Sequence, residues 1–210
     1  EELTLEWTKT GDEWSYEFRG LPKYRKGTAT AITYTVKETP VAGYEPSTEE
    51  AIGTEPDENG SFTGIDFEND LKTVSVSGSK TWADESNKYL MRPDGIELTL
   101  LADGEELELK DGEELTLEWT KTGDEWRYEY KNLPKYRKVV LEGITSYELI
   151  TYTVKETPVA GYEPSATDAI GGESDEAGNL SAVDFKNAMY TVSVSGSKTW
   201  ADESNKYLMR

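Results

Sequence analysis

Apolar and polar residues alternate along most of the chain, and glycine, aspartate or proline breaks the alternation about every 8–12 residues. Residues 73–82 show the pattern clearly, because every second side chain of a strand points to the same face. The more apolar face of this predicted strand carries Val74, Val76, Gly78, Lys80 and Trp82. No segment carries the apolar stripe of an amphipathic helix.

The same alternation predicts further strands. Their apolar positions lie at 96–100, 107–109, 115–119, 126–130, 150–154 and 183–185. Asp103 and Gly104 form a predicted hairpin turn, and a second turn is predicted at 121–124. About seven short strands with this spacing predict an all-β chain folded as an immunoglobulin-like antiparallel β-sandwich.

Long stretches of the sequence occur twice at a fixed distance. Residues 73–90 return letter for letter at 191–208, and residues 32–47 return at 150–165, a shift of 118 residues in both cases. Self-similarity at a fixed period is typical of repeat architectures. The sequence therefore predicts tandem repeats with a period of about 118 residues.

This period divides the chain into three parts. The expected parts are the C-terminal part of one repeat at 1–72, a complete repeat at 73–190 and the N-terminal strand of a further repeat at 191–210. The complete repeat has six additional residues, because residues 1–14 return at 113–126 with a shift of only 112. The additional residues lie within 139–149, where we expect a loop.

The chain is strongly acidic and contains neither cysteine nor histidine. Its 42 acidic and 22 basic residues give a net charge of −20 at pH 7. Nucleic acids and anionic membranes bind clustered lysine and arginine, so we expect neither as a partner. Without cysteine no disulfide can form, and without histidine Ser–His and Cys–His catalysis are excluded. The composition argues against a conventional hydrolase.

Other candidate sites are weaker. Two acidic segments, 57–60 and 175–179, are predicted to be turns, and neither has the ligand spacing of a calcium loop. We therefore expect no metal site and no cofactor. An aromatic set could stack on carbohydrate, but its members alternate in phase with leucine and valine, which favours the core. The set comprises Trp82, Trp119, Trp126, Tyr128 and Tyr130.

Three polar residues stand where the alternation expects apolar ones, each at the end of an apolar strand face. They are Lys80, Glu156 and Asn187. If the alternation holds, an amine, a carboxyl and a carboxamide all point into the sandwich. The partial repeats carry the corresponding residues Glu38, Asn69 and Lys198.

Three interpretations of this trio are open. The residues could lie at strand ends, where charges reach water, since Lys and Glu are seldom fully buried. They could form a buried Lys–Glu ion pair with Asn as a hydrogen-bond partner. They could also react, because burial favours a neutral lysine amine, which is a nucleophile. Lys80 would attack the side-chain carbonyl of Asn187 while Glu156 polarises that carbonyl and relays protons, leaving an isopeptide bond and ammonia.

Four motifs follow one another in a fixed order. They are SGSKTW at 77–82, NLPKY at 132–136, YTVKE at 152–156 with GYEP after it, and DFKN at 184–187. Together they resemble the Cna B-type repeat, a stalk domain of Gram-positive surface adhesins and pilins. The segment 139–149 departs from the family pattern.

The resemblance implies a chemistry and a role. In that family a lysine, a glutamate and an asparagine at these positions form a spontaneous intramolecular isopeptide bond. The resemblance therefore implies a Lys80–Asn187 cross-link promoted by Glu156, without turnover. It also implies a structural spacer in a cell-wall-associated, extracellular protein of a Gram-positive bacterium, with neighbouring repeats as partners. The alternative is a binding module that recognises a host protein or glycan through a sandwich face or 139–149.

The two ends of the chain allow two interpretations. They could be cut from a longer array whose other repeats hold the missing partners of the incomplete trios. Alternatively, 191–210 of one molecule could supply the missing first strand to 1–72 of another. Lys198 would then bond Asn69 with the help of Glu38. Closure within one molecule is least favoured, because a whole domain separates the two parts.

Overall fold

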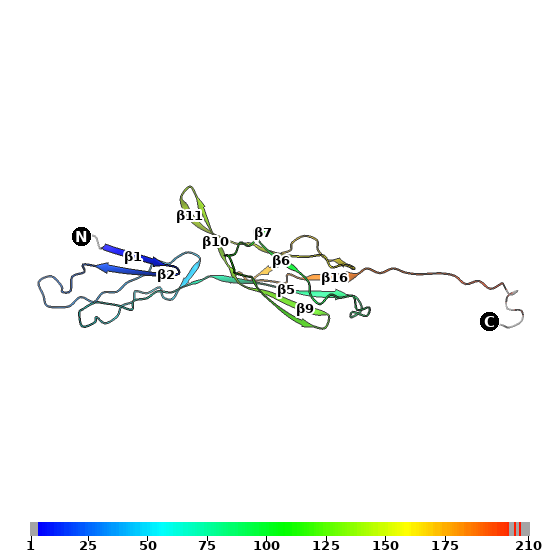
Figure 1. Ribbon diagram of the computed structural model, residues 1–210, viewed down its shortest axis with the longest axis horizontal. Coiled ribbons are helices and arrows are strands. Elements are labelled where there is room, and N and C mark those ends of the chain that lie inside the picture. Colours follow the sequence, from blue (N-terminus) through cyan, green and yellow to red (C-terminus); the bar gives the residue numbers. More distant parts are fainter. Residues whose placement is uncertain (1–3, 202–203, 205, 207–210) are drawn as a thin grey trace. The chain divides into compact units, whose positions relative to one another are not determined.

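A computed structural model describes residues 4–201, 204 and 206, and these residues form strands and turns but no helix. The chain divides into two compact units, Glu1–Lys72 and Thr73–Arg210. Figure 1 shows the elements of each unit. Of the predicted segment 191–210, residues 202–203, 205 and 207–210 lie outside the described residues.

The first unit consists of two small sheets. One pairs β1 (Thr4–Thr10) with β2 (Glu13–Arg19), and the other pairs β3 (Tyr44–Pro46) with β4 (Asn69–Leu71), both antiparallel. An isolated bridge joins Val36 to Ile52. None of residues 4–72 is fully buried, so the described part of this unit has no closed core.

The described residues of the second unit form twelve strands, ten in the two sheets of a β-sandwich and two in a separate hairpin. They are β5 (Thr73–Ala83), β6 (Leu98–Ala102), β7 (Glu105–Glu106), β8 (Thr116–Thr122), β9 (Glu125–Pro134), β10 (Tyr136–Leu141), β11 (Ile144–Leu149), β12 (Tyr152–Glu156), β13 (Tyr162–Pro164), β14 (Glu173–Ser174), β15 (Leu180–Ser181) and β16 (Phe185–Met189). The large sheet has β5 at its centre, with β16 and β15 along one edge and β9 along the other. The small sheet has the order β12-β6-β7.

The core lies between these two sheets. Val76 of β5, Tyr128 of β9 and Phe185 of β16 meet Leu100 of β6 and Val154 of β12 in one cluster of buried side chains. Each of these side chains falls on an apolar position of the sequence alternation. The predicted β-sandwich is therefore confirmed, and its inner faces are the faces that the alternation selects.

Two pairings differ from the all-antiparallel expectation, because β15 and β16 both pair with β5 in parallel. β5 and β16 are parallel neighbours, with Lys80 opposite Phe185 and Asn187 opposite Trp82. β5 begins the unit and β16 is its last strand, so the two run side by side in the same direction. Parallel pairing of strands this far apart in sequence carries no local signal, because it depends on the long connection between them.

Because Gly78 has no side chain, the backbone of Val183 can pass close to β5 at this position. A Cβ atom at this position would lie 1.8 Å from the backbone oxygen of Val183 and 2.9 Å from the hydroxyl of Tyr128. The amide of Val183 donates to the carbonyl of Ser77, and the Tyr128 hydroxyl donates to the carbonyl of Val183. A glycine is therefore required for this close approach.

Two local expectations are wrong. The segment 139–149 is not a loop, because it forms the tip of the antiparallel β10–β11 hairpin, which projects from the sandwich in Figure 1. Its run of β-branched and apolar residues is long enough to pair with itself across the Glu142-Gly143 turn. Residues 107–109 form no strand, because β7 ends after pairing only Glu105 and Glu106 with β6.

Candidate functional site

Three strands from both sheets bring the trio together. Lys80 lies on β5 and Asn187 on the adjacent strand β16, so both extend from the large sheet towards the interior. Glu156 is the last residue of β12 in the small sheet and pairs with Leu98. Because all three occupy inward positions of the alternation, the carboxyl faces the amine and the carboxamide across the sandwich.

The trio is buried and in contact. The exposed fraction is 0% for Lys80, 0% for Asn187 and 3% for Glu156. Nζ of Lys80 lies 2.6 Å from Oε1 of Glu156, and Nδ2 of Asn187 donates a hydrogen bond of 3.1 Å to the same oxygen. The interpretation of strand ends in water is therefore wrong. One carboxylate oxygen contacts both nitrogen atoms.

The contacts leave polar atoms without hydrogen-bond partners. Apart from its ion pair with Glu156, Nζ of Lys80 has no hydrogen-bond acceptor. Oε2 of Glu156 and Oδ1 of Asn187 are also buried without a donor. Buried polar groups of this kind are rare and destabilising. The unreacted trio is therefore not a satisfied structural network.

The surroundings favour an uncharged amine. Burial lowers the pKa of the Lys80 amine, and the neighbouring Glu156 carboxylate opposes this shift only in part. The ring of Trp82 lies 4.8 Å from Nζ. Burial also raises the pKa of the Tyr128 hydroxyl, which therefore stays neutral beside the site. The site is closed to solvent and contains one acid and one base.

The aromatic set forms the wall of this pocket. Trp82, Trp126, Tyr128 and Tyr130 are buried, and Trp119 packs partly buried against them. The rings of Trp82 and Trp126 meet edge to face, with centroids 5.3 Å apart. The predicted core role of this set is confirmed, and its packing excludes water from the trio.

The sequence analysis did not predict a second buried ion pair, which involves Asp84. Asp84 forms an ion pair with Arg92 and accepts a hydrogen bond of 3.0 Å from the hydroxyl of Tyr162. The backbone amide of Asn87 also donates to it. Asp84 follows Lys80 and Trp82 on the same face, so extending the alternation by two residues would have found it. The network closes the end of the sandwich beside Trp82.

The partial repeats hold the corresponding residues in two different states. In the first unit, Nδ2 of Asn69 donates a hydrogen bond of 2.8 Å to Oε1 of Glu38. Oε2 of Glu38 and Oδ1 of Asn69 are buried without hydrogen-bond partners. Lys198 lies in the segment 191–201, which joins no strand, and its Nζ is 4.1 Å from the centre of the Trp200 ring.

The two acidic segments are turns. Asp57 accepts hydrogen bonds from the backbone amides of Asn59 and Ser61, and Asp175 accepts one from the backbone amide of Asn179. The carboxylates are therefore used to shape the backbone. Within the part of the chain that the structure describes, no cluster of acidic residues could hold a metal ion. The described residues also include no helix long and apolar enough to cross a membrane.

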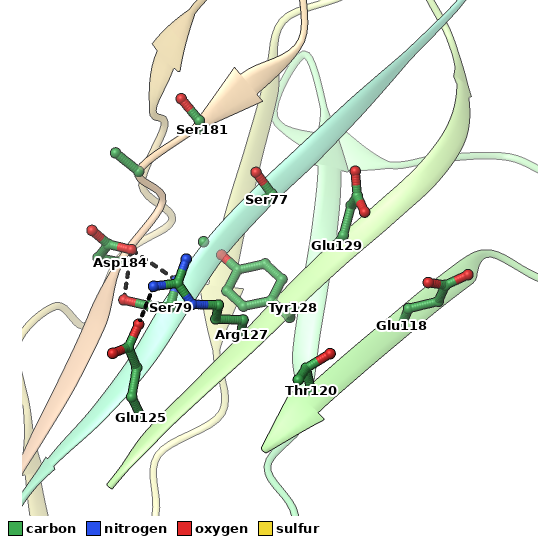
Figure 2. Close-up of a pocket in the computed structure, with 12 residues that line it drawn as sticks. Ser77, Ser79, Glu118, Thr120, Glu125, Arg127, Tyr128, Glu129, Ser181 and Asp184 are labelled. Carbon is green, nitrogen blue, oxygen red and sulfur yellow. Dashed lines mark hydrogen bonds and ion pairs between the residues drawn. The ribbon is translucent and has the colours of Figure 1, made fainter. Parts of the chain in front are cut away.

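A polar hollow lies on the outer surface of β5 and β9, away from the trio. Figure 2 shows Ser79, Glu125, Arg127 and Asp184 around it. Arg127 forms an ion pair of 2.7 Å with Glu125, and Ser79 donates to Asp184 through both its amide and its hydroxyl. These charged groups already pair with one another, so the hollow does not present converging groups for a ligand.

Comparison with known proteins identifies the family. The family model that matches is described as the Cna protein B-type domain, and it covers residues 2–57 and 76–173. The collagen adhesin of Staphylococcus aureus is 32% identical over 186 residues, which is 89% of this chain and 13% of that protein. The chain therefore spans a small part of the length of this relative.

Solved structures from the same organism are also similar. Two B repeat units of the collagen binding protein are 25% identical, over 89% of this chain and 43% of theirs, with a TM-score of 0.41. A single B repeat unit is 20% identical, over 90% of this chain and 86% of its own, with a TM-score of 0.33. Since the family model alone covers more than half of the residues, the chain belongs to the Cna protein B-type domain family.

Proposed function

We propose that the second unit is a structural spacer of a surface adhesin, stabilised by a self-formed isopeptide bond between Lys80 and Asn187 with Glu156 as proton relay. The observation that carries the proposal is one buried oxygen, Oε1 of Glu156, in contact with the nitrogen atoms of both reacting residues. Family membership supports it, since one relative is a collagen adhesin. These relatives are adhesin repeats, which supports a location outside a Gram-positive cell.

The reaction needs three proton transfers, and the geometry supports a carboxylate that performs all of them. Glu156 takes a proton from the Lys80 ammonium, and the neutral amine attacks Cγ of Asn187. Glu156 then returns a proton to Nδ2, 3.1 Å from Oε1, as the Cγ–Nδ2 bond breaks. Glu156 finally takes the second proton from the Lys80 nitrogen, so the products are a secondary amide, ammonia and a neutral Glu156 carboxyl.

Folding supplies the driving geometry. Holding an amine against an amide replaces an encounter in solution by a reaction within one molecule, which can lower the barrier by about 7–11 kcal/mol. Relay through a carboxylate gains a further factor of about 10²–10⁴ in rate. The dry pocket keeps Lys80 nucleophilic.

The bond would determine how the spacer carries tension. Force that enters along β5 crosses to β16 at Lys80 and Asn187, so residues 81–186 form a closed loop outside the load path. The next lysine of the repeat, Lys198, follows Asn187 by eleven residues. A fully extended link of that length spans roughly 36–40 Å, so the array could lengthen little before covalent bonds carry the load.

Intact mass spectrometry tests the bond. The folded chain is expected to weigh less than its sequence by one ammonia, and digestion should yield a branched peptide that joins Lys80 to Asn187. Glu156→Gln is expected to slow the reaction at least about 100-fold, because the relay is lost. Glu163→Gln on β13 changes an exposed carboxylate and is the matched control. A folded wild-type chain of full mass, without the branched peptide, would refute the proposal.

A second candidate function rests on the β10–β11 hairpin. Its residues Val140, Leu141, Ile144 and Leu149 are exposed although they are large and apolar. Such a surface is typical of a contact site for another protein. Saturable binding to a matrix protein or glycan that is lost in Leu141→Ser with Ile144→Ser, at unchanged thermal stability, would favour a binding module. Equal binding by both proteins, or none, would rule out this hairpin as the site.

A further inference from the structure

One buried nitrogen atom of the second unit has no role in the reaction described above. Nε1 of Trp82 is buried without a hydrogen-bond acceptor, and the whole residue is only 7% exposed. A buried indole N–H usually finds an acceptor, and each exception needs a physical reason. The packing of the aromatic rings explains why Trp82 is in the core, but it does not explain why its N–H has no partner.

The unpartnered side-chain atoms of the second unit are two donors and two acceptors. Among its described residues, the donors are Nζ of Lys80 and Nε1 of Trp82. The acceptors are Oε2 of Glu156 and Oδ1 of Asn187. The proposed reaction accounts for Nζ, because Nζ becomes the nitrogen of the new amide. The second donor therefore remains to be explained.

Strand pairing places Trp82 beside the residues that would react. Asn187 is the register partner of Trp82 in the parallel pair of β5 and β16, and Lys80 precedes Trp82 by two residues on the same face of β5. Adjacent strands lie about 5 Å apart, and register partners point to the same face. The centre of the Trp82 ring is also 4.8 Å from Nζ of Lys80. The indole is therefore next to both partners of the proposed bond.

The indole is held in place by other rings. Trp82 meets Trp126 edge to face, with ring centroids 5.3 Å apart, and it meets Tyr162 edge to face at 4.9 Å. A donor that packing already holds in position can stabilise a developing charge without the cost of reorientation. Trp82 has this property before the reaction begins.

The neighbouring tyrosine hydroxyls are already engaged. Tyr128 donates a hydrogen bond of 2.7 Å to the carbonyl of Val183, and Tyr130 donates one of 2.9 Å to the carbonyl of Leu98. Neither hydroxyl can turn to the reacting amide without leaving a carbonyl unpaired, which is costly inside a protein. Nε1 of Trp82 can donate to the amide without this cost, because it has no acceptor to give up.

We propose that Trp82 is a further catalytic residue of the cross-linking reaction, whose Nε1–H donates a hydrogen bond to Oδ1 of Asn187 as negative charge develops there. The inference rests on the proposed function, because this charge arises only when Nζ of Lys80 attacks. The Nζ–Cγ bond forms as an electron pair of the carbonyl double bond moves to Oδ1. When the Cγ–Nδ2 bond breaks, that pair restores the carbonyl, and Trp82 keeps its proton.

Two observations favour Oδ1 of Asn187 over Oε2 of Glu156 as the acceptor. Asn187 is on the strand next to Trp82, whereas Glu156 belongs to the other sheet. Oδ1 also becomes negatively charged during the attack, when a fixed donor has its greatest effect, whereas Glu156 takes up a proton. In the product, the oxygen of the new amide retains the hydrogen bond, so neither Nε1 nor Oδ1 stays unpartnered.

The first experiment compares the rate of ammonia loss in Trp82→Phe and in the wild type. The full chain is isolated unfolded in denaturant, diluted into folding buffer and followed over time by intact mass. Phenylalanine keeps a ring beside Nζ of Lys80 but has no N–H, so the rate should fall about 100-fold. Tyr152→Phe removes a buried hydroxyl that donates to Pro134 and is the matched control, with the wild-type rate expected. A wild-type rate in Trp82→Phe would overturn the proposal.

The pH dependence of this rate distinguishes a hydrogen-bond donor from an effect on the amine. The indole N–H does not titrate where proteins fold, so Trp82→Phe should react more slowly at every pH, with an unchanged midpoint of the profile. A shifted midpoint would overturn the proposal, because Trp82 would then act through the protonation of Lys80 and not as a donor to Asn187.

A second variant keeps the shape of the side chain, in case Trp82→Phe folds poorly. Benzothienylalanine at position 82 has the two fused rings of tryptophan, with sulfur in place of the N–H. It should slow the loss of ammonia as Trp82→Phe does, and a wild-type rate would overturn the role of Nε1. A wild-type chain that keeps its full mass would instead refute the proposed cross-link, and this inference with it.

The same analogue tests whether Nε1 is unpartnered before the reaction. In a Lys80→Ala background no bond can form, and replacing an unpaired buried N–H by sulfur should leave the free energy of unfolding equal or higher. Chemical denaturation measures this difference. A clear loss of stability would show that Nε1 already has an acceptor in the unreacted fold, and it would overturn the proposal.

Discussion

The segments 73–82 and 191–200 have the same ten residues and different structures. The first is the central strand of the large sheet, with β9 on one side and β16 and β15 on the other. The second lies outside every sheet of the described residues. The comparison shows that this sequence is competent to form a strand but does not do so alone. Its neighbours decide, because a strand's preference comes mainly from packing against adjacent strands.

The same comparison separates the lysine of the proposed cross-link from its counterpart in the tail. Lys80 is buried beside a carboxylate, and burial lowers the pKa of its amine. Lys198 has identical sequence neighbours and is exposed. The burial and the lowered pKa that the proposed reaction needs therefore come from the completed sandwich rather than from the SGSKTW motif. A motif of this kind marks where chemistry can occur once the other two strands are in place.

The largest expected effect comes from removing the donor of the completed site. Lys80→Met should abolish the mass loss and lower the free energy of unfolding by of order 4–5 kcal/mol, by analogy with a disulfide that closes a loop of about a hundred residues. Lys186→Met changes an exposed lysine of β16 and should leave both unchanged. Chemical denaturation with intact mass measures the difference. Equal stability of Lys80→Met and the wild type would contradict the cross-link.

A smaller effect is expected at the glycine that both segments share. Gly78→Ala places a Cβ atom 1.8 Å from a backbone oxygen, which cannot move as a flexible side chain would, so a loss of about 3 kcal/mol is expected. Gly196→Ala meets no atom within 4 Å and should leave thermal unfolding unchanged. Equal stability losses in the two variants would show that their settings do not differ.

The smallest effect is the pH dependence of Asp84, the first residue after β5. The Arg92 guanidinium lowers the pKa of this carboxyl from 3.8 to about 2. A lowered folded-state pKa stabilises above the unfolded value, so about 2 kcal/mol should be lost as the pH falls from about 4 through 2. Asp84→Asn should remove this part of the pH dependence, and thermal unfolding from pH 5 to pH 2 measures it. Asp168→Asn changes an exposed carboxyl and is the control.

Sequence alternation was sufficient to predict the sandwich and the direction in which Lys80, Glu156 and Asn187 point. It succeeds because a strand has only two faces, and an inward residue is fixed by its neighbours two positions away. It also placed the aromatic set in the core. These predictions depend on local spacing, which the sequence shows directly.

Two features that the sequence analysis did not predict depend on contacts between residues far apart in the chain. The parallel pairing of β5 with β16 joins residues about a hundred positions apart, and no local pattern reports it. The same holds for Asp84, whose partner Tyr162 comes from β13. The hairpin at 139–149 was mistaken for a loop because its exposed apolar residues resemble neither a buried face nor a polar turn. The sequence shows the additional residues of this segment but does not show that they pair with each other.

The shared direction of β5 and β16 has a mechanical consequence of its own. When the chain is pulled from the start of β5 and from the end of β16, the two strands slide along each other instead of peeling apart. All backbone hydrogen bonds between them then resist together, from the pair at Lys80 to the pair at Ala83. A newly folded unit would thus withstand shear before any covalent closure, which gives slow chemistry time to finish under strain.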